Sequence, residues 1–465
     1  MSKRTVFSLL VMGLLALLLS GCDTFLAPRD ALSPMSTPAD GGNYLVIFHG
    51  NNLPADVEED VIAAGGQVRT RFDQVGAALV TTEASSFVAD MAAMPGVQYV
   101  IPDVVLDWHP GETYVEVLEG EPVTLPEGES IGDDEWYYNA YQWSMKAIDA
   151  PGAWDAGYTG AGVRVAILDS GIDPEHPDLA PNLNTALSTS FVPYEPYIDD
   201  GDGHGTHVAG IVAAADNAYG SIGVAPNAEI VAVKVLDSTG SGAFSWVIDG
   251  MLYANAIGAD VISMSIGAYL PRSGFWTEDG EKVGANEVAG LVTLLTRVIN
   301  YIWSNGSFVV GSAGNDSIDF TGDAGLLHVP SDCGRILSIS ATGPLGWGFD
   351  PTVDLDTPAF YTNYGSAIDY AAPGGNVDFN IYPGDGWWID MVFSTFPGGW
   401  AWMAGTSMAT PHVSGVAALI IEANGHSLTP SEAESILRQS ADDLGKPGRD
   451  EWYGRGRVNA AQAVK

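Results

Sequence analysis

The stretch VRVAILDSG, residues 163–171, indicates the fold class. Its segment 163–168 is almost continuously apolar, as in a strand that is covered on both faces. Such strands, alternating with helices, form parallel sheets with helices on both sides. We therefore predict an α/β fold with a mostly parallel, doubly wound sheet. Further apolar runs of this kind lie at 228–236, 260–267, 307–314 and 335–341, with helix-like segments between them at 207–215 and 244–258.

The composition is that of a globular and strongly acidic protein. The chain has 465 residues, of which 46% are hydrophobic, and 18 Lys and Arg stand against 58 Asp and Glu, for a net charge of −40. This length suits one large core and a smaller domain. A charge of this sign repels phosphate backbones, so we expect no nucleic-acid partner, and we expect a monomer.

The N-terminus is typical of an exported protein. A basic head precedes the apolar run Val6–Leu19, whose roughly fourteen residues are too few for a membrane span of about twenty. The run ends in Leu19-Ser20-Gly21-Cys22, which resembles the lipobox of bacterial lipoproteins. The resemblance implies lipid on Cys22 and an extracytoplasmic protein anchored to the cell envelope, either permanently or until maturation releases it. Cys333 is the only other cysteine, so lipidation of Cys22 would leave no intramolecular disulfide.

Changes in pattern divide the chain into five parts. Within the large domain, the stretches 268–290 and 376–391 fit neither strand nor helix, and we expect them to be surface insertions. The predicted parts are a signal peptide at 1–21, a tether at 22–43, a small α+β domain at 44–108, an acidic linker at 109–135 and the α/β domain at 136–465.

Three polar residues follow predicted strands or begin predicted helices. Asp169 ends the strand at 163–168, and His204 begins a helix in DGHGTHVAG. Ser407 lies in GTSMATPHVSG, where Pro411 places it at a helix entry because proline cannot donate to the carbonyl of residue 407. Functional groups of parallel sheets gather at these positions. A carboxylate, an imidazole and a hydroxyl are the parts of a nucleophilic serine site, although a serine there can also be an ordinary helix cap.

These segments, together with SFVVGSAGN, resemble the signature blocks of the subtilisin-like serine proteases, the subtilases. The resemblance covers residues 142–460 and implies a serine endopeptidase that cleaves polypeptides. Asp169, His204 and Ser407 would form its catalytic triad, and Asn315 would donate to the oxyanion. An inactive subtilase fold that serves as a surface binding protein is the alternative, and a processing protease with few substrates shares all these motifs.

The resemblance also implies contacts with substrate. One strand would pair with an extended peptide through its backbone. The inserted stretch at 268–290 follows the primary specificity pocket directly and could cover or reshape it. The implied residues are Gly240, Ser241 and Gly242 in the strand, and Ser265, Ile266, Gly267, Ala313 and Gly314 in the pocket walls.

The small domain and one loop carry two further resemblances. The segment AMPGVQYVIPD, residues 93–103, resembles the late part of a subtilase propeptide, which inhibits its own enzyme; a permanent accessory domain is the alternative. HPDL and AADNAYGSIGVAP resemble a subtilase calcium site, and oxygen ligands of this number suit Ca²⁺. The implied ligands are Asp178, the Asn217 side chain and the carbonyls of Ala215, Tyr219 and Ser221, with Asp134 as a less secure upstream ligand.

Overall fold

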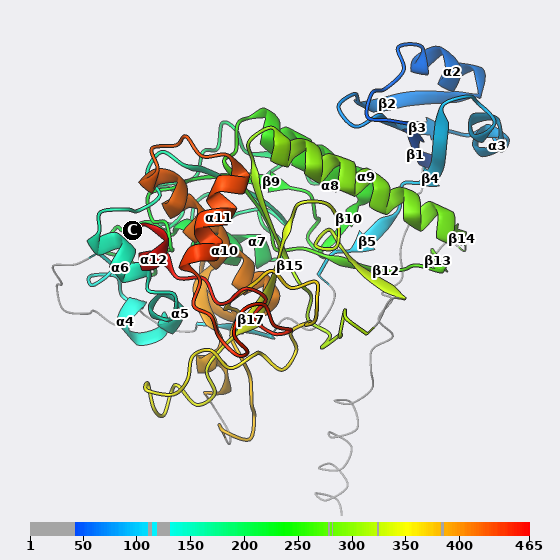
Figure 1. Cartoon of the computed structure of the whole chain (residues 1–465). Helices are drawn as coiled ribbons and strands as arrows, with labels where there is room; N and C mark the ends of the chain where they lie inside the picture. The colour runs from blue at the N-terminus through cyan, green and yellow to red at the C-terminus, as the bar shows by residue number, and fades with distance from the viewer. Residues whose placement is uncertain are drawn as a thin grey trace, which may run out of the picture. The chain divides into compact units, whose positions relative to one another are not determined.

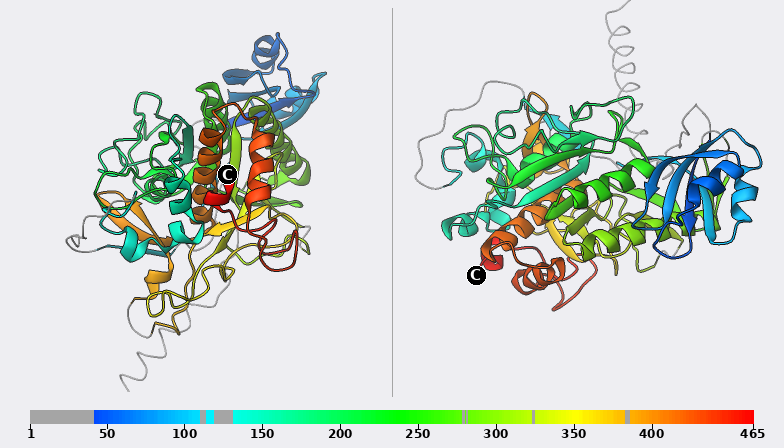
Figure 2. Two further views of the ribbon diagram at one scale, coloured as in Figure 1. Left: turned by 60° about the vertical axis from the view of Figure 1, so that its left-hand side comes forward. Right: turned by 90° about the horizontal axis from the view of Figure 1, so that it is seen from above.

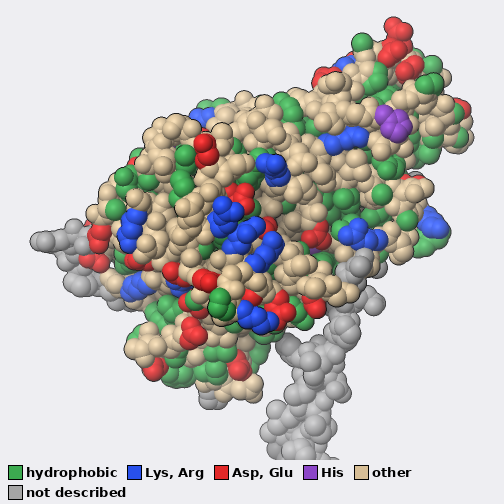
Figure 3. Space-filling view, in the orientation of Figure 1, with side chains coloured by type: hydrophobic (Ala, Val, Ile, Leu, Met, Phe, Trp, Pro, Cys, Tyr) green, Lys and Arg blue, Asp and Glu red, His purple; other side chains and the backbone are tan. Residues whose placement is uncertain are grey.

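The computed structural model describes residues 42–109, 114–118, 131–277, 280, 282–322, 325–382 and 386–465. The predicted signal peptide, Cys22 and most of the predicted tether and linker lie outside these residues. Within the described ranges, no helix is both long and apolar enough to cross a bilayer. Figure 3 shows acidic side chains beside basic ones on the face that it draws.

A seven-stranded sheet forms the centre of the large domain, where Figure 1 labels its strands β9, β15 and β17. Its strand order is β18-β17-β15-β11-β7-β9-β8. Every pairing in it is parallel, which confirms the predicted parallel α/β sheet. All residues of its strands β11, β15, β17 and β18 are buried, which explains their continuous apolar runs. The strands are β7 (Arg164–Asp169), β8 (Thr189–Ser190), β9 (Glu229–Lys234), β11 (Val261–Met264), β15 (Phe308–Ser312), β17 (Leu337–Thr342) and β18 (Tyr370–Pro373).

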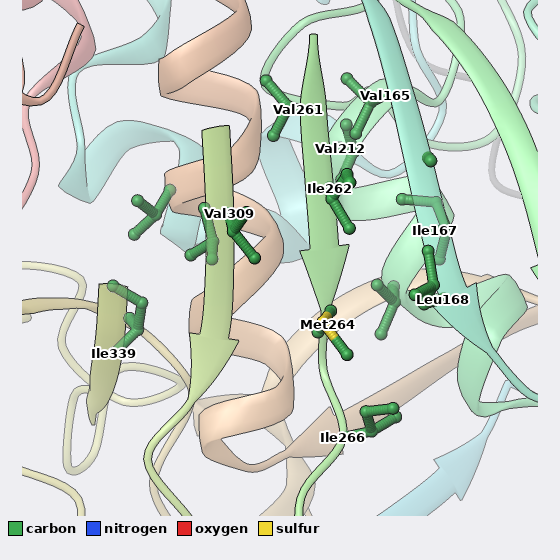
Figure 4. Close-up of a cluster of buried hydrophobic side chains, with 14 of the residues drawn as sticks. Val165, Ile167, Leu168, Val212, Val261, Ile262, Met264, Ile266, Val309 and Ile339 are labelled. Atoms are coloured by element: carbon green, nitrogen blue, oxygen red, sulfur yellow. The ribbon is translucent and has the colours of Figure 1, made fainter. Parts of the chain in front are cut away.

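Two pairs of long helices cover the two faces of this sheet (Figure 2). One pair is α7 (His204–Ala213) and α10 (Thr406–Ala423), and the other is α8 (Phe244–Ala256) and α9 (Ala285–Ser304). Figure 4 shows Val212 of α7 among the side chains of Val165 and Ile262, which belong to adjacent strands. The sheet and α7 thus share one apolar core.

Five further helices among the described residues flank the sheet. They are α4 (Tyr138–Tyr141), α5 (Trp143–Ala147) and α6 (Ala150–Asp155) before β7, and α11 (Pro430–Ser440) and α12 (Ala460–Ala463) near the C-terminus. The start of α11 is fixed by a capping box, in which Thr429 and Glu432 each accept a hydrogen bond from the other residue's backbone N–H.

The segment from Gly42 to Pro102 forms a small α+β unit. Its antiparallel sheet has the order β2-β3-β1-β4. Apolar residues of this sheet and of two helices form a core separate from that of the large domain, and it includes Val46, Val61, Phe87 and Met91. The elements are β1 (Gly42–Phe48), α2 (Val57–Ala63), β2 (Gly66–Phe72), β3 (Ala77–Thr82), α3 (Phe87–Ala92) and β4 (Val97–Pro102).

The side chain of Arg297 on α9 (Ala285–Ser304) binds mainly to backbone carbonyl oxygens of the small unit. Its Nη1 donates to the carbonyl oxygens of Phe48 and Gly50, each at 2.8 Å, and to that of Val75 at 3.3 Å. Its Nη2 donates to Oε1 of Gln98 at 2.8 Å. One guanidinium group thus holds three separate turns or strands of the small unit.

Three segments differ from what the sequence pattern predicted. In the predicted linker, β6 (Tyr114–Val117) pairs with β20 (Gly399–Ala404), which also pairs with β19 (Val392–Phe396). The stretch 268–290 begins in the interior rather than on the surface, because Tyr269 and Leu270 are buried. The stretch 376–391 ends in a 3₁₀-helix, η1 (Trp387–Asp390), with Asp390 buried.

Local pairing explains the buried start of 268–290. The strand β12 (Ala268–Pro271) pairs antiparallel with β16 (Leu326–Val329), and β13 (Gly274–Trp276) pairs with β14 (Lys282–Gly284). These partners lie far apart in the sequence or are very short, so no run of alternating residues indicates them. The remaining short pair joins β5 (Val105–Asp107) to β10 (Ser241–Ala243), also antiparallel.

Candidate active site

Three elements of the large domain bring the predicted catalytic residues to one edge of the sheet. Asp169 is the last residue of β7, His204 is the first residue of α7, and Ser407 lies in the first turn of α10. This edge contains the carboxyl ends of the parallel strands, where side chains and helix N-termini converge. All three residues are buried.

Asp169 and His204 form a hydrogen-bonded pair. Nδ1 of His204 lies 2.8 Å from Oδ1 of Asp169, which also accepts from the backbone N–H of Ser170 at 2.7 Å. Burial alone would raise the pKa of Asp169, but the imidazoles of His204 and His109 outweigh it and hold that pKa well below its usual range. The carboxylate is therefore ionised at neutral pH and orients the ring of His204.

Ser407 forms its hydrogen bonds with Ser265. Its Oγ donates to the Ser265 carbonyl at 3.0 Å, while Nε2 of His204 has no hydrogen-bond partner among the described residues. Oγ of Ser265 donates in return to the Ser407 carbonyl at 2.8 Å. That carbonyl lacks a helical donor because Pro411, four residues later, has no N–H. The expected helix entry is thus present, but α10 starts early enough that Pro411 lies inside the helix.

Asn315 lines the same small cavity as Ser407. Its Oδ1 accepts from the backbone N–H and from Oγ1 of Thr406, both at 2.8 Å. With the amide oxygen held in this way, the amide nitrogen is the end that remains for a group bound beside Ser407. This is the polarity that an oxyanion requires.

His109 was missed by the sequence analysis and contacts both members of the Asp169–His204 pair. Its ring centroid lies 4.0 Å from that of His204, and its Nε2 is 3.7 Å from Oδ1 of Asp169. Burial lowers the pKa of His109, but the carboxylates of Asp169, Asp202 and Asp107 outweigh it, so the net change is upward. The only sequence signal was an imidazole a few residues beyond the propeptide-like segment.

The predicted substrate strand is occupied by the chain itself. β5 pairs antiparallel with β10, so that Leu106 lies opposite Gly242. Beyond β5, Trp108 donates from its backbone N–H to the Gly240 carbonyl at 3.0 Å and from Nε1 to the Gly242 carbonyl at 2.9 Å. Its own carbonyl accepts from the N–H of Gly267 at 2.8 Å. The residues that the sequence assigned to substrate therefore hold a segment in an extended form.

The predicted pocket walls lie on either side of the cavity beside Ser407. Ser312 donates to the Ile266 carbonyl at 3.3 Å, which joins the two walls, and Ala313 donates to Ile339 of β17 at 3.0 Å. Gly267 and Gly314 line the cavity itself, together with His328, which the sequence analysis did not identify.

Asp178 is the predicted calcium ligand whose surroundings best fit a cation. Its Oδ2 accepts from the backbone N–H of Ser221 at 2.8 Å, from Oγ of Ser221 at 3.1 Å and from Nε1 of Trp400 at 2.9 Å. Its carbonyl accepts from the N–H of Ala215 at 2.8 Å. Oδ1 of Asp178 is buried and has no hydrogen-bond partner among the described residues. A buried carboxylate oxygen without a donor fits a bound cation.

Glu135, rather than the weakly assigned Asp134, binds the loop that was predicted to hold calcium. Its carboxylate accepts from the backbone N–H groups of Asn217 at 2.7 Å, Ala218 at 2.8 Å and Tyr219 at 2.7 Å. Burial raises the pKa of Glu135 to about 8. The carboxylate of Glu135 thus satisfies these N–H groups of the loop. The oxygen atoms of the loop remain as the groups that would hold a cation.

Comparisons with known proteins agree with this geometry. Residues 160–456 match the subtilase family. The chain is 35% identical over 352 residues to M-protease of Shouchella clausii, covering 76% of this chain and 77% of that protein. It is 33% identical over 446 residues to subtilisin E of Bacillus subtilis, covering 94% and 95%.

A solved structure shares the fold. It is the epidermin leader peptide processing serine protease of Staphylococcus aureus, which is 23% identical, has a TM-score of 0.72, and is matched over 92% of this chain and 100% of that one. An identity this low supports the fold alone, whereas the curated relatives and the family match cover most of the catalytic domain. On this evidence the chain belongs to the subtilase family and is a serine endopeptidase.

Proposed function

We propose that this endopeptidase cleaves polypeptides through an Asp169–His204–Ser407 triad and is made as an inhibited, exported precursor. The observation that carries the catalytic part is the 2.8 Å contact of Asp169 with His204 at the sheet edge where Ser407 and Asn315 share one cavity. An inactive binding protein would have no reason to retain all four groups together.

The chemistry follows from the roles of these side chains. Oγ of Ser407 attacks the peptide carbonyl while Nε2 of His204 takes its proton, and Asp169 stabilises the imidazolium that forms. The amide of Asn315 donates to the oxyanion. His204 then gives the proton to the leaving amine, and water hydrolyses the acyl-enzyme by the reverse sequence. In the structure Ser407 donates to Ser265 instead, so its hydroxyl must rotate toward His204 before attack.

The α+β unit is proposed to be a propeptide that inhibits the enzyme. Its C-terminal extension occupies Gly240, Gly242 and Gly267, and His109 covers His204. A peptide in this place excludes substrate from the groups that would align it. We propose domain limits of 44–108 for the inhibitor and 136–465 for the enzyme, joined by an acidic linker.

Export and a structural calcium ion complete the proposal. The lipobox-like segment supports lipid on Cys22 and attachment to the outside of the cell membrane. The unpaired Oδ1 of Asp178 and the loop at 215–221 support Ca²⁺, held by Asp178, the Asn217 side chain and the carbonyls of Ala215, Tyr219 and Ser221. The ion would link the loop at 215–221 to the turn that contains Asp178 and stabilise the fold.

A fluorophosphonate probe tests the catalytic proposal, because it reacts only with an activated serine. The matured enzyme should be labelled, and Ser407→Ala should abolish labelling and peptide hydrolysis. Ser414→Ala, which removes another buried serine hydroxyl from the same helix, should retain labelling. A chain that stays unlabelled after removal of residues 42–109 would favour the inactive binding protein.

A further inference from the structure

The cavity beside Ser407 is small, and Trp108 and His109 of the small unit's extension form part of its lining. Its volume is about 10 Å³, which is the space of about one water molecule. Its walls include Gly267 on one side and Gly314 on the other, the residues that the family resemblance assigns to the primary specificity pocket. Neither of these two glycines contributes a side chain, so another residue fills the space between them.

The residue that fills the space between Gly267 and Gly314 is His328, through its imidazole ring. A methyl group added to Gly267 would lie 2.2 Å from Cε1 and 2.3 Å from Nε2 of this ring. A methyl group added to Gly314 would lie 3.0 Å from the same Nε2 and 2.5 Å from the hydroxyl oxygen of Tyr269. The ring of His328 thus contacts both walls, and Tyr269 stands behind it.

The inserted stretch fixes this ring in place. β12, its first strand, puts Tyr269 directly opposite His328 of β16, and the two ring centroids are 4.9 Å apart. Nδ1 of His328 lies 2.7 Å from Oγ of Ser331, and the Tyr269 hydroxyl accepts from Nδ2 of Asn363 at 2.8 Å. His328 is only 1% exposed while Trp108 and His109 line the same cavity.

We propose that His328, supported by Tyr269, closes the base of the primary specificity pocket and restricts cleavage to sites after small residues such as Gly, Ala or Ser. The inference rests on the proposed catalytic function and names its substrate class. A large side chain would have to displace a ring that is packed on both sides, and overpacking of that kind is strongly unfavourable. Burial also lowers the pKa of His328 to about 3, so the pocket presents a neutral ring to substrate at neutral pH.

The test compares peptides that differ only in the residue before the cleaved bond, Ala or Phe, with the matured enzyme. We expect kcat/KM for the Ala peptide to exceed that for the Phe peptide by at least about a hundredfold in the wild type. His328→Gly should lower this ratio by at least about tenfold. His426→Gly, at an exposed histidine whose φ of 57° suits glycine, should leave the ratio unchanged.

Each outcome decides the inference. A wild-type enzyme that prefers Phe overturns it while leaving the catalytic proposal intact, and this measurement requires no variant to fold. A ratio that His328→Gly does not change also overturns it, provided that the variant still reacts with the fluorophosphonate probe. If neither peptide is cleaved and the probe does not react, the catalytic proposal itself has failed.

Discussion

The ring of His109 lies against the ring of His204, with centroids 4.0 Å apart and planes inclined by 40°. His109 is also 3.7 Å from Oδ1 of Asp169, the atom that orients His204. The chain thus places its own imidazole against both members of the proposed Asp169–His204 pair. The preceding residue, Trp108, forms hydrogen bonds with Gly240 and Gly242 on one side and with Gly267 on the other. His109 is therefore held in place by these bonds and not by its own charge alone.

Trp108 should provide much of the inhibitory affinity. A polypeptide of residues 42–109, which has its own core, should inhibit the matured enzyme. Trp108→Ala removes a fully buried side chain, which costs about 3–5 kcal/mol, so the inhibition constant should rise by about 150- to 5,000-fold. Val88→Ala, on an exposed position of α3, should have little effect. Failure of the wild-type polypeptide to inhibit would instead favour a permanent accessory domain.

Binding of the α+β unit should weaken as pH rises. The carboxylate of Asp103 accepts from the N–H of Ser245 at 2.9 Å and from its Oγ at 2.6 Å, and burial raises the pKa of Asp103 to about 6 from 3.8. Burial and Asp103 raise the pKa of Asp249 to about 7, and the pKa of His109 is also raised. A group with a higher pKa in the bound state takes up a proton on binding, so Asp103 and His109 favour binding at low pH, as does Asp249 to the extent that Asp103 raises its pKa.

The window of this effect follows from those values. Affinity should be greatest near pH 4 and fall as the pH rises from about 4 to about 7, by about tenfold or more. Calorimetric titration of the polypeptide 42–109 into a Ser407→Ala catalytic domain of residues 136–465 measures it without catalysis. Asp103→Asn should flatten the part of the profile between pH 4 and 6. Affinity that rises with pH would contradict the prediction.

Lipid on Cys22 should determine where the protein is found. Cys22→Ser should move it from the membrane fraction to the soluble exported fraction and abolish palmitate labelling, since each buried methylene contributes about 0.8 kcal/mol. Cys333→Ser is the matched control, because that thiol is buried and should carry no lipid. Membrane association that survives Cys22→Ser would show that something other than this lipid holds the protein.

Removal of calcium should lower the melting temperature. An ion bound only by the folded state contributes about 2.7 kcal/mol at a hundredfold excess over its dissociation constant. A chelator should therefore lower the Tm, and Ca²⁺ but not Mg²⁺ should restore it. Asp178→Ala should melt lower in either buffer and lose the response to chelator, whereas Asp350→Asn, at an exposed acid, should keep it. If the chelator does not change the Tm of the wild-type protein, the proposed calcium site is excluded.

The sequence predicted those features that depend on local pattern. Buried strands such as β15 are mostly apolar, and Asp169, His204 and Ser407 stand at strand or helix ends that the pattern already marks. The position of Asn315 came from a family block rather than from periodicity.

Features that depend on distant pairing were missed. Tyr269 and His328 meet only because β12 pairs with β16, and both strands are too short to show alternation. Likewise, nothing near Glu135 in the sequence indicates that its carboxylate caps three N–H groups of a loop some eighty residues later.

The contact of Arg297 with the small unit has a consequence for protein engineering. Three of its four acceptors are backbone carbonyl oxygens, at Phe48, Gly50 and Val75. Every amino acid supplies such an oxygen. This contact therefore requires a particular backbone conformation but almost no particular side chains. A foreign inhibitor domain whose backbone places three carbonyl oxygens in the same positions could therefore be grafted onto α9. The surface side chains of that domain could be changed without loss of this contact.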